Sequence, residues 1–64
     1  MTQSEIKTSI DSHKARLNYE VERAMKALID DEFTIAAMAA TQAAEHKGAI
    51  KELQFLLECM EVEA

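Results

Sequence analysis

The sequence predicts an all-α protein, a two-helix antiparallel hairpin that dimerises into a four-helix bundle. Three observations point to this fold. The 64 residues contain no proline and one glycine, and strong helix formers dominate. Apolar residues recur at alternating three- and four-residue steps, the spacing that keeps one helix face against a neighbour. An acidic segment near the middle of the chain interrupts this pattern and marks the turn.

The first helix is expected over about residues 3–29. Thr2 and Glu5 have the spacing of a capping box, which predicts a helix start. The pattern places a seam along this helix, meaning the stripe of residues that faces the other helix: Ile10, Lys14, Leu17, Val21, Ala24 and Leu28.

The turn is expected at about residues 30–32. Asp30, Asp31 and Glu32 suit the N-terminal cap and first turn of a second helix, where acidic groups favour the positive end of the helix dipole. Folding here sets large residues of the first helix, such as Met25 and Leu28, against the small alanines that follow the turn. The alternative is one long coiled-coil helix, in which the acidic segment is absorbed as a stutter.

The second helix is expected over about residues 33–62. Its seam is well defined: Ala36, Ala39, Ala43, His46, Ile50, Leu53, Leu57 and Met60. A second apolar stripe lies elsewhere on the same helix and predicts a second neighbour: Phe33, Ala37, Ala40, Ala44, Phe55, Cys59 and Val62.

The second stripe and the bulky residues after Gly48 predict a contact surface between chains, because a single hairpin covers only one seam of its second helix. The stripe is centred on Phe55. The candidate interface residues are Phe33, Ala37, Ala44, Ile50, Leu53, Phe55, Leu56, Leu57, Cys59, Met60 and Val62. Gly48 itself is expected to mark a close contact between helices, with a kink or a break in the helix as the alternative.

Length and composition bound the remaining possibilities. A chain of 64 residues makes one domain at most and is marginally stable alone, which favours oligomerisation. The single cysteine excludes an internal disulfide, and no stretch has the apolar length of a membrane span. We therefore expect a soluble, cytoplasmic protein. The net charge of −5 is uneven: residues 1–29 carry +1 and residues 30–64 carry −6.

No catalytic or cofactor site is expected. The sequence contains no glycine-rich phosphate loop and no nucleophile beside a base, so we do not expect an enzyme. His13 and His46 approach one another in a hairpin, but two histidines and one cysteine fall short of a zinc site. No metal or other cofactor is predicted.

Two resemblances suggest partners. The layout of two near-equal helices around an acidic turn resembles the Rop family of plasmid RNA-binding hairpins, whose RNA-contacting face uses basic residues of the first helix. Here Lys7 and Lys14 lie roughly opposite Arg16 and Arg23, with acidic residues between them, which argues against RNA binding. The stretch QAAEHKGAIKELQFLLE, residues 42–58, is similar to small phage-encoded proteins. That resemblance implies a virion component or a factor acting on a host protein, located in the host cytoplasm or the virion.

The sequence thus favours a non-enzymatic structural or interaction protein that acts through helix–helix packing, with a second copy of itself or another protein as partner. The alternatives are a Rop-like RNA-binding regulator and a small acidic inhibitor of a host protein. No membrane partner is expected.

Overall fold

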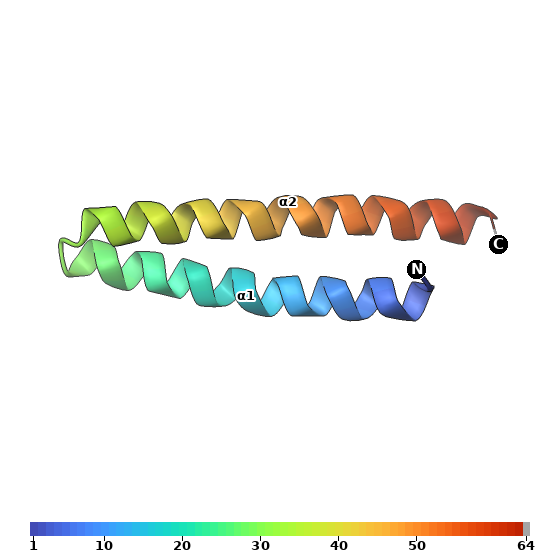
Figure 1. Cartoon of the computed structure of the whole chain (residues 1–64), viewed down its shortest axis with the longest axis horizontal. Helices are drawn as coiled ribbons and strands as arrows, with labels where there is room; N and C mark the ends of the chain where they lie inside the picture. Colours follow the sequence, from blue (N-terminus) through green and yellow to red (C-terminus); the bar gives the residue numbers. More distant parts are fainter. Residues whose placement is uncertain (64) are drawn as a thin grey trace.

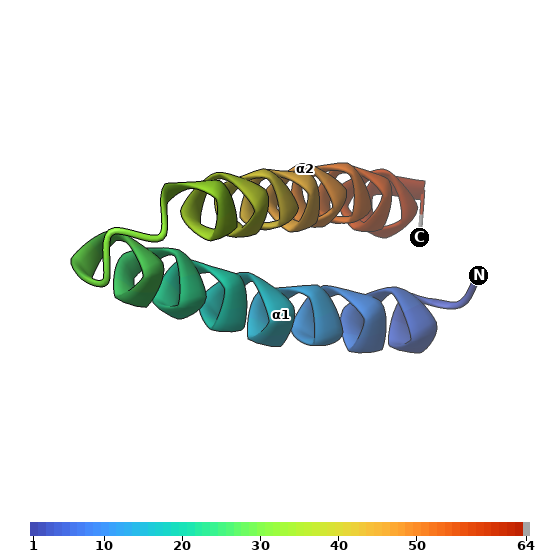
Figure 2. The ribbon, with the colours of Figure 1, turned by 60° about the vertical axis from the view of Figure 1, so that its left-hand side comes forward.

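The computed structural model describes residues 1–63 and consists of two antiparallel helices joined by a tight turn (Figure 1). Helix α1 spans Gln3–Ile29 and helix α2 spans Phe33–Glu63. The helices stay side by side when the view is rotated (Figure 2). The predicted helical hairpin is confirmed, and the alternative of one continuous helix is wrong.

A capping box starts α1, as the sequence predicted. The Thr2 hydroxyl accepts a hydrogen bond from the Glu5 backbone N–H, and the Glu5 carboxylate accepts one from the Thr2 N–H, both at 3.1 Å. These bonds satisfy two amides that have no partner inside the helix. The backbone N–H and the hydroxyl of Thr2 lower the pKa of the Glu5 carboxyl below its usual value.

The turn is shaped by the end of α1 rather than by an acidic cap on α2. The Asp31 N–H donates to the Leu28 carbonyl at 3.2 Å, and the Glu32 N–H donates to the Ala27 carbonyl at 2.8 Å. This pair of bonds is a Schellman motif. Asp31 adopts the left-handed conformation that the motif requires, with φ of 58°. Aspartate tolerates that conformation better than most non-glycine residues.

The seam of α2 is confirmed. Ala36, Ala39 and Ile50 are buried, and the other members of the seam are partly buried: Ala43, His46, Leu53, Leu57 and Met60.

The predicted seam of α1 is wrong in its phase over much of the helix. Lys14, Val21 and Leu28 are exposed. The buried or partly buried residues at heptad spacing are instead Ile6, Ile10, His13, Leu17, Glu20, Ala24 and Ala27. This observed seam keeps Lys14 in water.

The core is graded along the hairpin. In the half near the chain's N-terminus, Ile6, Ile10 and Ile50 are buried, with Leu17, Leu53, Leu57 and Met60 packed against them. Near the turn the buried residues are Ala27, Ala36 and Ala39. Small residues therefore occupy both helices at the turn, and the predicted packing of large residues against alanine is wrong there.

Gly48 lies on the exposed side of α2, and a Cβ atom placed on it would have no neighbour within 4 Å. The expected close helix contact at this position is therefore wrong.

The molecule is elongated, with extents of 50 × 14 × 13 Å, and α2 continues beyond the first residues of α1 (Figure 1).

Candidate interaction surfaces

The residues expected to form an interface between chains divide into two groups. Ile50, Leu53, Leu57 and Met60 pack inside the hairpin, against Ile6 and Ile10 of α1. The others lie on the outside of α2, and all except the partly buried Cys59 are exposed: Phe33, Ala37, Ala44, Phe55, Leu56, Cys59 and Val62. The apolar surface available to a partner is consequently smaller on α2 than the sequence suggested.

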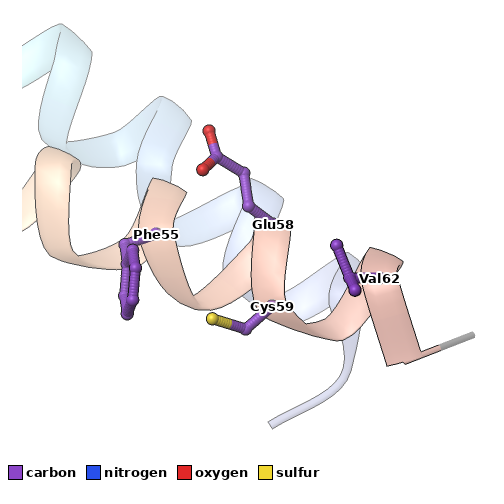
Figure 3. A pocket seen from close by; sticks show the side chains of 4 residues that line it. All are labelled: Phe55, Glu58, Cys59 and Val62. Atoms are coloured by element: carbon purple, nitrogen blue, oxygen red, sulfur yellow. The ribbon is translucent and has the colours of Figure 1, made fainter.

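One apolar surface, the open-end patch, consists of Phe55, Leu56, Cys59 and Val62. Phe55 is 68% exposed and Val62 is 87% exposed. Phe55, Cys59 and Val62 line a shallow hollow together with Glu58 (Figure 3). All four hollow-lining residues come from α2. The patch lies among carboxylates, because Glu52, Glu58 and Glu61 are exposed on the same stretch of helix.

A second apolar surface lies beside the turn, and only its residues on α2, which belong to the predicted second stripe, were anticipated from the sequence. Val21, Met25 and Leu28 are exposed on α1, and Phe33 is exposed at the start of α2. In heptad notation, with the observed seams at positions a and d, Val21 and Leu28 fall at position e of α1. Phe33 and Ala40 fall at position e of α2.

In an antiparallel pair, the e positions of the two helices lie along the same flank, so these side chains share one side of the hairpin. Met25 and Ala37 fall at position b, which adjoins position e on each helix. We call this surface the turn-end face, and its members are Val21, Met25, Leu28, Phe33, Ala37 and Ala40. The signal that could have revealed it is the heptad that starts at Ile6 and Ile10, because its continuation passes through Ala24 and Ala27 and leaves Val21 and Leu28 outside.

The opposite flank is more polar. Arg23, Lys26, Asp30 and Glu32 line a groove there, together with Ala27 and Ile35. Arg23 also forms an ion pair with Glu20, with Nη1 and Oε2 at 3.2 Å. The pair is partly buried, and one ion pair at this i, i+3 spacing on a helix adds about 0.2–0.5 kcal/mol. This flank offers charged groups to a partner rather than a continuous apolar surface.

His13 and His46 meet in the middle of the hairpin. Their Nδ1 atoms are 2.9 Å apart and their ring centroids are 5.1 Å apart, with both side chains partly buried. A hydrogen bond at this distance requires that one Nδ1 carries a proton and the other does not. Among the described residues, no three His, Cys, Asp or Glu side chains gather closely enough to hold a metal ion.

The comparisons with known proteins add no relative. No protein family, curated protein or solved structure matches this chain. Within residues 1–63, neither helix combines the length and the apolar character that crossing a membrane requires. The two apolar surfaces and the histidine pair are the features of this hairpin that bear on its function.

Proposed function

We propose that this protein is a non-enzymatic helical protein that acts by associating with a second copy of itself, so that two hairpins form a four-helix bundle. The observation that carries the proposal is the amount of surface that the single hairpin leaves exposed. Its size and its chemistry both favour another helical chain as the partner.

The exposed area is larger than a compact monomer of this mass should have. The hairpin exposes 4786 Å². The area–mass relation for folded monomers gives about 4100 Å² for a chain of 7.2 kDa. The excess, about 700 Å², approaches the roughly 800 Å² that each partner contributes to a standard protein interface. The radius of gyration, 14.7 Å, likewise exceeds the value of about 11 Å for a compact domain of 64 residues.

Much of this exposed surface is apolar. Both helices contribute large apolar side chains that are more than a third exposed, and continuous apolar patches of this kind usually mark interaction sites. Besides Met1 they are Tyr19, Val21, Met25, Leu28, Ile29, Phe33, Ile35, Met38, Phe55, Leu56 and Val62.

The hairpin core is small in comparison. Within residues 1–62, the buried apolar residues are three isoleucines and three alanines: Ile6, Ile10, Ala27, Ala36, Ala39 and Ile50. Burying a large aliphatic side chain contributes about 1.5–3 kcal/mol, whereas ordering each residue costs about 1.5 kcal/mol. Covering the exposed apolar side chains with a second chain therefore adds stability that one hairpin lacks.

The test is to measure mass and thermal stability over a range of concentrations. Sedimentation equilibrium should give twice the chain mass, and the melting temperature followed by circular dichroism should rise with protein concentration. A chain that stays monomeric at high micromolar concentration, with a melting temperature independent of concentration, would exclude self-association. The exposed surfaces would then have to serve a different partner.

A further inference from the structure

We infer that the second copy docks on the turn-end face, with the long axes of the two hairpins antiparallel. The inference rests on the proposed self-association and specifies its geometry. It also differs from the expectation based on sequence, which centred the contact on Phe55. Symmetry and charge together distinguish between the two apolar surfaces.

A two-fold interface brings each surface patch against its own copy. Residues near the axis therefore meet identical residues, and a charge placed there meets a like charge. The turn-end face draws on both helices, and the exposed carboxylates around it lie at its margins: Glu22 on α1 and Asp30, Asp31 and Glu32 at the turn. Met25, the most exposed of its α1 members at 59%, lies between Val21 and Leu28 along α1.

The open-end patch fits a second copy less well. Glu52, Glu58 and Glu61 are interspersed with Phe55 and Val62, and Lys51 is the one basic residue in residues 48–64. Packing this patch on itself would bring two sets of carboxylates together and remove water from them, which is unfavourable. Charge thus favours the turn-end face.

The same reasoning sets the relative direction of the two hairpins. Lys14 and Lys47 are exposed and occupy position e, so they extend the flank of the turn-end face toward the middle of the molecule. Asp30, Asp31 and Glu32 are exposed at the turn. An antiparallel arrangement places the acidic turn of one chain near the lysines of the other. A parallel arrangement would align acidic turn with acidic turn and lysine with lysine.

The experiment compares three single substitutions by sedimentation equilibrium. Met25→Glu should raise the dissociation constant of the dimer at least about tenfold, because two introduced carboxylates meet across the axis. Phe55→Glu and the control Tyr19→Glu should leave the dimer within about twofold of wild type. Tyr19 is a suitable control because it is also large and exposed, yet lies on α1 outside both apolar surfaces.

The outcomes separate this inference from the proposed function. If wild type is dimeric but Phe55→Glu dissociates it while Met25→Glu does not, self-association stands and the turn-end face is wrong. If wild type is monomeric, both fail.

Cross-linking provides a second measurement that does not depend on a disruptive substitution. In a Cys59→Ser background, Met25→Cys should form a disulfide-linked dimer under mild oxidation, because position 25 of each chain lies near the two-fold axis. A cysteine at Tyr19 should cross-link far less. Equal cross-linking at both positions would overturn the inference.

Charge reversal tests the antiparallel direction. A variant that carries both Lys14→Glu and Lys47→Glu should form a weaker dimer, because the lysines of one chain then no longer attract the acidic turn of the other.

Discussion

The Nδ1 atoms of His13 and His46 lie 2.9 Å apart across the interface between the two helices. Both residues occupy seam positions, so this polar contact sits between the isoleucine-rich half of the core and the alanine-rich half. A hydrogen bond at this place matters chiefly through the cost of losing one partner, since an unpaired and partly buried polar group is unfavourable.

We predict that the two histidines are energetically coupled. His13→Leu and His46→Leu should each lower the free energy of unfolding by about 1 kcal/mol, because each leaves the other ring without its partner. The double variant should cost less than the sum of the two or even gain stability, since an apolar pair then fills the site. Urea denaturation at fixed protein concentration gives the four values of the cycle.

If, at neutral pH, the double variant loses as much stability as the two single variants together, the short contact contributes no energy.

The capping box predicts a specific titration. Because hydrogen bonds from Thr2 lower the pKa of Glu5 in the folded state, the contribution of this carboxylate is present above the unfolded value and is lost as pH falls through the lowered pKa. Thr2→Ala should move the pKa of Glu5 upward, while Thr2→Ser should retain the lowered value. Carboxyl chemical shifts measured during an NMR titration would reveal the change. An unaltered Glu5 titration in Thr2→Ala would mean that the hydroxyl plays no part.

Gly48 should be a site of easy stabilisation. A Cβ at this position meets nothing within 4 Å, so Gly48→Ala should gain helix propensity, about 0.5–1 kcal/mol, without crowding. The matched reverse change is Ala15→Gly on the exposed side of α1, which should lose a similar amount. Chemical denaturation measures both. Loss of stability in Gly48→Ala would indicate that another chain covers this part of α2.

Close approach of the helices near the turn should make Ala39 intolerant of larger residues. Ala39 is fully buried at 0% exposure. Ala39→Leu should therefore cost about 1–3 kcal/mol through overpacking. The same substitution at the exposed Ala15 should be nearly neutral. A well-folded Ala39→Leu variant with unchanged stability would mean that the helices can separate at the turn without penalty.

The two helices and the position of the break follow from local features of the sequence. Helix formers without proline sustain both segments, and the capping box at Thr2 and Glu5 depends on residues three positions apart. The seam of α2 was also predictable, because its apolar residues keep alternating three- and four-residue steps without a break from Ala36 to Met60. The two-helix architecture and half of the interface were therefore accessible from sequence alone.

The phase of α1 was decided by the tertiary structure. After Leu17, two stripes that share Ala24 are equally available to the helix: one adds Val21 and Leu28, and the other adds Glu20 and Ala27. Hydrophobicity favours the larger residues. The folded hairpin instead buries Ala27 opposite a helix start whose own seam residues, Ala36 and Ala39, are small. Alanine on both sides lets the backbones approach closely and join through a short turn, and bulky residues at the same positions would hold them apart. Whether Val21 and Leu28 face inward or outward depends on this contact between segments distant in sequence, which hydrophobic periodicity within one helix does not encode.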